Sequence, residues 1–115
     1  MVIWITGLSG SGKTTLATAL YKAMKPRLPA LVRIDGDEVR ALFGNSLSFS
    51  ESDRRLQIQR IQSLAAMLDG QGLPVIVAAL YAHPDLLAWN REHFSDYFEI
   101  YLEASLELVR SRDPK

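Results

Sequence analysis

A glycine-rich segment near the start of the chain carries the residues whose types and spacing point most directly to chemistry. The pattern G-x-x-x-x-G-K-[ST] is filled by Gly7, Leu8, Ser9, Gly10, Ser11, Gly12, Lys13 and Thr14, with Thr15 following. Glycines let the backbone curl so that successive N–H groups face phosphate oxygens. Lys13 can reach the terminal phosphates, and the Thr14 hydroxyl suits Mg²⁺. The segment therefore predicts a binding site for a nucleoside triphosphate.

The elements on either side of this segment are those that the motif requires. Residues 2–6 are apolar and β-branched, which is typical of a buried strand. Residues 15–24 are rich in helix formers and place Leu16, Leu20 and Met24 on one face. A helix in this place directs its positive N-terminal end at the same phosphates.

A second polar cluster follows the next predicted strand, residues 31–34. Asp35-Gly36-Asp37 stands at the carboxyl end of that strand, the edge where ligands bind in open parallel α/β sheets. A short helix over 38–43 and a loop over 45–49 lead to a long helix over 51–69. Ser50 is its expected N-cap, and Asp53 lies in its first turn.

The remaining pattern completes an alternation of strands and helices. Strands are predicted over 74–80 and 98–102, and helices over 85–93 and from 104 or 105 through 112. Tyr97, Phe98 and Tyr101 are expected to be strand and core residues. The run over 74–80 is apolar on both faces, as in a central parallel strand. We therefore expect one α/β domain over residues 1–115, a three-layer α/β/α sandwich with a parallel sheet, as in P-loop NTPases.

Composition narrows the classes of function. Thirteen Lys and Arg balance thirteen Asp and Glu, which argues against broad attraction to nucleic acid or to an anionic membrane. Because there is no cysteine, disulfides, thiolate metal sites and a cysteine nucleophile are excluded. No apolar run reaches the length of a membrane span, and the first strand leaves no room for a signal peptide. Cytoplasm is the expected location.

Together these motifs resemble the adenylylsulfate kinases (APS kinases). The resemblance rests on the P-loop, Asp35-Gly36-Asp37-x-x-Arg40, Phe49-Ser50-x-x-Asp53-Arg54, and Arg112-Asp113-Pro114-Lys115. It implies transfer of the ATP γ-phosphate to the 3′-hydroxyl of adenosine 5′-phosphosulfate, with Mg²⁺, in sulfate assimilation.

Roles for single residues follow from the same resemblance. Asp37 would orient or deprotonate the acceptor hydroxyl, and Asp35 would support Mg²⁺ through water. Arg40 and Arg54 would bind the charged phosphosulfate end, and Phe49 would stack on the acceptor base. Gln57 stands where the family has an acceptor-binding asparagine. Arginine forks suit phosphate and sulfate oxygens, so these assignments are chemically coherent.

Each of these residues also has a purely structural interpretation. Asp35 and Asp37 could form a turn, and Asp53 could serve only the helix dipole. Phe49 could be a core residue, and Arg40 and Arg54 could be solvated surface charges.

The chain departs from the family pattern mainly on the acceptor side. Gln57 replaces asparagine, Gln59 replaces an arginine, and Ala82 replaces a serine, which excludes a phosphoserine there. The family's basic lid, which follows R-D-P-K, and its usual segment before the first strand are missing, so the chain resembles a truncated member. A partner subunit covering the final sheet edge would favour a homodimer. Two other functions stay open, a kinase for another nucleotide-linked acceptor such as cytidine diphosphoramidate, and a non-catalytic nucleotide-binding module.

Overall fold

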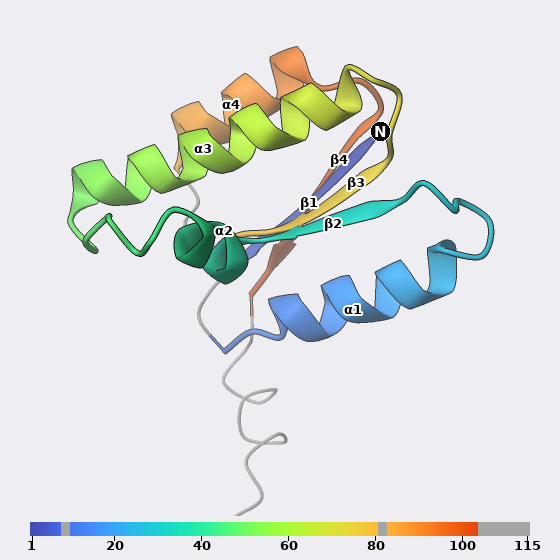
Figure 1. Ribbon diagram of the computed structural model, residues 1–115, viewed down its shortest axis with the longest axis horizontal. Coiled ribbons are helices and arrows are strands. Elements are labelled where there is room, and N and C mark those ends of the chain that lie inside the picture. Colours follow the sequence, from blue (N-terminus) through green and yellow to red (C-terminus); the bar gives the residue numbers. More distant parts are fainter. Residues whose placement is uncertain (8–9, 81–82, 104–115) are drawn as a thin grey trace, which may run out of the picture.

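The structure, a computed structural model, describes residues 1–7, 10–80 and 83–103. Its elements in chain order are β1 (Val2–Gly7), α1 (Lys13–Met24), β2 (Val32–Asp35), α2 (Gly36–Leu42), α3 (Glu51–Asp69), β3 (Val75–Ala78), α4 (Pro84–His93) and β4 (Tyr97–Leu102). Figure 1 shows three layers, with α1 on one face of the sheet and α3 and α4 on the other. This arrangement confirms the predicted α/β/α sandwich.

The four strands form one parallel sheet in the order β2-β3-β1-β4. β1 pairs with β3 on one side and with β4 on the other. The chain leaves β1 toward the β2 side, returns through β3, and ends beyond β1 at β4. The direction in which the chain crosses the sheet therefore reverses next to β1. In open α/β sheets, ligands bind at such a switch point, outside the carboxyl ends of the strands. The P-loop begins there.

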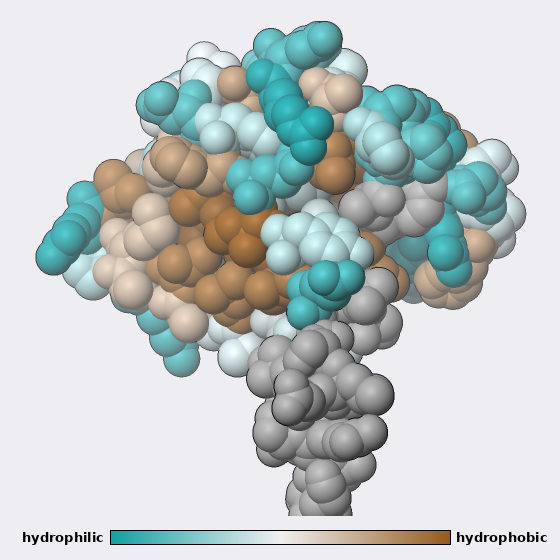
Figure 2. All heavy atoms as spheres, turned by 180° about the vertical axis from the view of Figure 1, so that it is seen from behind, coloured by the Kyte–Doolittle hydropathy of each residue, from teal (hydrophilic) through white to brown (hydrophobic). Residues whose placement is uncertain are grey.

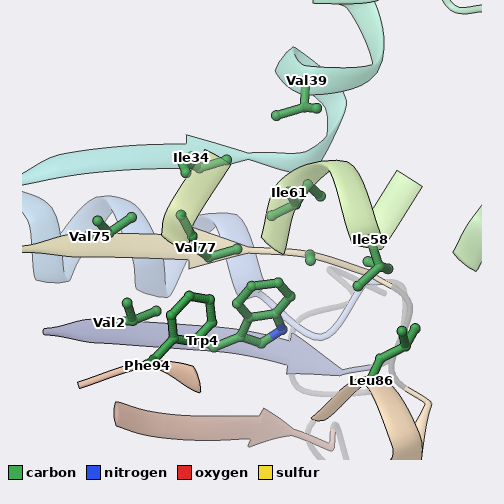
Figure 3. Close-up of a cluster of buried hydrophobic side chains, with 12 residues drawn as sticks. Val2, Trp4, Ile34, Val39, Ile58, Ile61, Val75, Val77, Leu86 and Phe94 are labelled. Atoms are coloured by element: carbon green, nitrogen blue, oxygen red, sulfur yellow. The ribbon is translucent and has the colours of Figure 1, made fainter. Parts of the chain in front are cut away.

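The two faces of β1 contribute to two separate hydrophobic clusters. Val2 and Trp4 face α3 and α4, where Trp4 lies 6.3 Å from Phe94 between ring centroids (Figure 3). Ile3 and Ile5 face α1 and belong to the second cluster. Because successive side chains of a strand alternate between faces, a strand apolar at every position is buried on both sides.

Most predicted elements are present with small differences at their ends. α3 has the predicted bounds, since the Ser50 hydroxyl caps the N–H of Asp53 at 3.3 Å. α1 begins at Lys13, two residues earlier than predicted, and β3 covers only Val75–Ala78 of the predicted 74–80. The predicted last helix lies outside the described residues.

The interpretation of Phe98 and Tyr101 as core residues was wrong. Both lie in β4 as predicted, but their exposed fractions are 54% and 52%. Among the described strands, β4 lies at the edge of the sheet and pairs with β1 alone, so less of it is covered. Figure 2 shows a broad apolar area on the face of the molecule opposite to the view of Figure 1.

Within the described ranges, none of the helices combines the length and the apolar character that crossing a bilayer requires.

Candidate phosphoryl-transfer site

The glycines of the P-loop adopt the backbone that the motif requires. Gly7, Gly10 and Gly12 have φ angles of 148°, 77° and 97°, in the region that other residues rarely adopt. Gly12 precedes α1 as an N-cap without a side-chain hydrogen bond. The first N–H groups of α1 therefore have no side-chain cap, and such groups favour an anion at a helix N-terminus. Leu8 and Ser9 of the predicted site lie outside the described residues.

Two cavities meet at the start of α1. The smaller, about 310 Å³, is lined by Gly10, Gly12 and Thr15 together with Lys13 and Thr14. The larger, about 600 Å³, is also lined by Lys13 and Thr14 and extends to the opposite wall formed by α2 and α3. Lys13 and Thr14 thus lie between a hollow over the glycine loop and a cavity large enough for a nucleotide.

The larger cavity brings together all the acceptor-side residues predicted from the sequence. They are Asp35, Asp37, Arg40, Phe49, Arg54 and Gln57. Four elements or loops supply them: the end of β2, helix α2, the loop before α3, and the first two turns of α3. Of the predicted donor residues, Ser11 is 3% exposed, so it would offer a ligand its backbone rather than its side chain.

Asp35 and Asp37 occupy different positions despite being two residues apart. The Oδ1 atom of Asp35 accepts hydrogen bonds from the N–H groups of Asp37 at 2.9 Å and Glu38 at 3.4 Å, as the N-cap of α2. The turn interpretation of this cluster is thus correct in part, since Asp35 has a capping function. Asp37 is exposed and lies close enough to Lys13 for a Coulombic interaction. The cap fixes the backbone from which the Asp37 carboxylate projects.

Burial and a neighbouring charge shift the pKa of Lys13 in opposite directions. Burial lowers the pKa of its ammonium group below the usual value, while the nearby Asp37 carboxylate raises it by a smaller amount. The pKa of Lys13 is lowered overall. A partly desolvated ammonium interacts more strongly with an incoming phosphate than a fully hydrated one does.

Arg40 and Phe49 form a stacked pair at the rim of the cavity. The Arg40 guanidinium carbon lies 4.6 Å from the centroid of the Phe49 ring, and Arg40 Nη1 donates to the carbonyl oxygen of Leu47 at 3.0 Å. The Phe49 side chain is 69% exposed, so its interpretation as a core residue was wrong. An exposed ring beside a cation provides a surface on which a planar base can stack.

Arg54 and Gln57 lie one turn apart on the cavity side of α3. The Arg54 side chain is exposed, and its guanidinium makes no hydrogen bond or ion pair with another described residue. Gln57 is buried, and its Nε2 donates to the carbonyl oxygen of Gly36 at 2.8 Å. Its Oε1 atom has no hydrogen-bond partner within the ranges that the structure describes. Gln57 therefore fixes α3 to the first residue of α2.

An apolar wall of the cavity was not predicted from the sequence. Ile58 and Ile61 of α3 line it together with residues 78–80, at the end of β3 and just after it, and Tyr101 lines it from β4. Two features of the sequence could have predicted this wall. Residues 78–80 and Tyr101 stand at the carboxyl ends of their strands, where Asp35 also lies. Ile58 and Ile61 are apolar residues three positions apart on α3, a spacing that places them on one face of the helix.

The donor set fits a magnesium ion that arrives with phosphates. Thr14, Asp35 and Asp37 line the same cavity, and Mg²⁺ is usually bound through one or two protein groups plus substrate phosphates and water. Among the described residues there is no cluster of three or more His, Cys, Asp or Glu side chains that could hold a metal alone. Thr14 is the residue that would contact the ion, and the Asp35 carboxylate would support it through water.

Comparison with known proteins agrees with this geometry. The family model "Adenylylsulphate kinase" matches residues 1–115. The adenylyl-sulfate kinase of Staphylococcus carnosus is 38% identical over 117 residues, covering 100% of this chain and 59% of that protein. The cytidine diphosphoramidate kinase of Campylobacter jejuni is 35% identical over 114 residues, covering 99% of this chain and 66% of that protein.

A solved structure supports the same family. The Mycobacterium tuberculosis APS kinase CysC, in complex with AMPPNP and APS, superposes with a TM-score of 0.77 at 27% identity. The superposition covers 99% of this chain and 68% of that one. The chain spans roughly three fifths to two thirds of these relatives' lengths. Because the family model spans residues 1–115, the whole sequence, the chain belongs to the adenylylsulphate kinase family.

Proposed function

We propose that the protein transfers the γ-phosphoryl group of ATP to a hydroxyl group of a nucleotide-linked acceptor. The observation that carries this proposal is the meeting of two cavities at Lys13 and Thr14. ATP phosphates would occupy the hollow over the glycine loop, and the acceptor would occupy the larger cavity. The transferred group would then pass beside the two residues that the cavities share.

The residues at this junction suit phosphoryl transfer. Asp37 would orient the acceptor hydroxyl and take its proton while that oxygen bonds to the γ-phosphorus. The bond between this phosphorus and the bridging oxygen breaks, and ADP leaves. Lys13 would neutralise charge on the phosphoryl oxygens throughout. A bound Mg²⁺ would supply further neutralisation. Positioning and charge neutralisation account for most catalysis in this reaction class.

Adenylyl sulfate is the acceptor that the family favours, and 3′-phosphoadenylyl sulfate would be the product. Arg40 and Arg54 would face its phosphosulfate, and Phe49 would stack on its base. The test is ATP turnover by the full-length protein with adenylyl sulfate and Mg²⁺, measured as ADP formation. Absence of both turnover and adenylyl sulfate binding would contradict this choice of acceptor.

Gln57 favours a second candidate, cytidine diphosphoramidate. It lines the acceptor cavity at the position where the resemblance to the adenylylsulfate kinases places an asparagine, so this wall differs from the pattern expected for adenylyl sulfate. Its amide nitrogen donates to Gly36 and its amide oxygen is buried, so the side chain would act on the shape of the cavity. Comparing kcat/KM for the two acceptors at equal ATP would separate the candidates.

The same assays also test the third possibility, a non-catalytic nucleotide-binding module. Tight ATP binding without transfer to either acceptor would select a nucleotide-binding module. A homodimer formed through the edge of β4 and a cytoplasmic location stay predictions. Sedimentation of the full-length protein tests the first, and cell fractionation tests the second.

A further inference from the structure

The loop before α3 is fastened by a compact group of polar contacts. The Oδ2 atom of Asp53 accepts two hydrogen bonds from Ser48, one from its backbone N–H at 2.9 Å and one from its hydroxyl at 2.7 Å. The Ser48 hydroxyl oxygen also accepts the N–H of Ser50 at 3.2 Å. Ser50 in turn caps Asp53. We call this set, formed by Ser48, Ser50 and Asp53, the Ser48–Asp53 clasp.

The clasp holds the two residues on either side of Phe49. Ser48 and Ser50 are both bonded within it, while the ring between them projects outward with 69% exposure. An exposed aromatic side chain on a loop would otherwise sample many orientations. Here its backbone is fixed at both neighbouring residues, and the direction of the ring is thereby restricted.

Arg40 fixes the same loop from the opposite side. It donates to the carbonyl oxygen of Leu47 and covers one face of the Phe49 ring. The ring therefore has one face toward Arg40 and one that a planar base can use. Phe49 and Arg40 both line the larger cavity, whereas Ser48 and Asp53 do not. The clasp thus acts on the acceptor cavity through residues that it holds in place.

The charge of Asp53 is stabilised in this arrangement. Hydrogen bonds from Ser48 lower the pKa of its carboxyl group below the usual value, and the nearby Arg60 and Arg40 lower it further. The carboxylate therefore stays ionised throughout the pH range in which a kinase operates. Charge-assisted hydrogen bonds of this kind are stronger than those between neutral groups.

We propose that Asp53 is a positioning residue for the acceptor, acting through Ser48 to preorganise the Phe49–Arg40 surface before the acceptor binds. The inference rests on the proposed function and extends it, since it assigns Asp53 more than a helix-dipole charge. Ordering a loop in advance reduces the conformational entropy lost on binding. The clasp should therefore affect acceptor affinity and leave ATP affinity unchanged.

The test compares Asp53→Ala and Asp53→Asn with Glu51→Gln in the full-length protein. Glu51 lies in the same first turn of α3, so its substitution removes one charge at the same helix end. We expect Asp53→Ala to raise the acceptor KM about tenfold, with KM for ATP and kcat at saturating acceptor unchanged. Asp53→Asn should raise it less, because an amide oxygen still accepts the Ser48 N–H. Glu51→Gln should leave all three constants unchanged.

Hydrogen exchange provides a readout that does not depend on activity. The amide of Ser48 should exchange faster in Asp53→Ala and at the parental rate in Glu51→Gln. The acceptors assayed are adenylyl sulfate and cytidine diphosphoramidate. A parent protein that transfers phosphate to neither overturns the proposed function and the positioning role with it. A parent that transfers phosphate, with the same acceptor KM in Asp53→Ala and Glu51→Gln, overturns the positioning role alone.

Discussion

Replacing Gly7 by alanine should separate the two strands that enclose the start of the P-loop. A Cβ atom on Gly7 would lie 2.1 Å from the carbonyl oxygen of Leu102 and 2.9 Å from its carbonyl carbon. Both are backbone atoms of β4, the strand paired with β1 over residues 2–7. No side-chain rotation can relieve such a contact, so the backbone of one strand must move.

The expected cost of Gly7→Ala has two parts. The φ angle of 148° lies in a region that is essentially restricted to glycine, which costs about 1–3 kcal/mol for another residue. Forcing extra volume into a packed site costs about 1–3 kcal/mol more. The sum, about 2–6 kcal/mol, is a large share of the roughly 5–15 kcal/mol that stabilises a domain.

Gly72→Ala provides the matched control. Gly72 also has a positive φ, 81°, but nothing lies within 4 Å of the position of its Cβ. Its substitution should cost only about 1–2 kcal/mol, from the backbone conformation alone. Urea unfolding of the parent and of both variants measures the difference in the free energy of unfolding. Equal losses in the two variants would show that β1 and β4 do not approach each other as closely as described.

Three further predictions concern the site and its surroundings. Lys13→Met should lower kcat by about 10²–10³, because a charge-neutralising group is lost, and circular dichroism should show an unchanged fold. Gln57→Asn shortens the side chain that bonds to Gly36 and should shift the ratio of kcat/KM values toward adenylyl sulfate; an unchanged ratio would contradict the specificity assigned to Gln57. Asp85 forms a two-bond ion pair with Arg55, whose hydrogen bonds hold the pKa of Asp85 well below its usual value. Since this pKa is lower in the folded state, the pair stabilises the protein above about pH 4 and loses this effect as the pH falls further. The parent should therefore lose more thermal stability than Asp85→Asn between about pH 4 and pH 2, and parallel melting curves would contradict this.

The sequence predicted the parts of the site whose signals are local. The P-loop motif requires a strand, a glycine loop and a helix in succession, and β1 and α1 provide them. The bounds of α3 were predicted correctly because Ser50 is a strong N-cap and Gly70 follows the last helical residue. Such signals depend on a few neighbouring residues and not on the rest of the fold.

Burial across the sheet and within helices was harder to predict. The apolar pattern of residues 98–102 indicates a strand, but it does not tell whether a second strand or a helix covers it. Phe98 and Tyr101 are exposed because β4 lies at an edge. Conversely, Gln57 and Gln62 are buried on α3 although they are polar. The Gln62 amide nitrogen donates to the carbonyl oxygen of Leu86 and to Oδ1 of Asn90, partners 24 and 28 residues away that no local pattern reveals.

The two aspartates of Asp35-Gly36-Asp37 show how a capping residue can also serve a reactive one. A turn and a catalytic pair were opposed interpretations of the same three residues. In the structure, the Asp35 carboxylate accepts the N–H of Asp37 itself, so the cap orients the residue whose side chain interacts with Lys13. Removing the Asp35 carboxylate would therefore disturb Asp37 even if Asp35 never touched Mg²⁺. A loss of activity in Asp35→Ala alone cannot assign Asp35 to the metal. Asp35→Ser, whose hydroxyl can still cap α2, separates the two contributions, because a capping role predicts recovery of activity and a metal role does not.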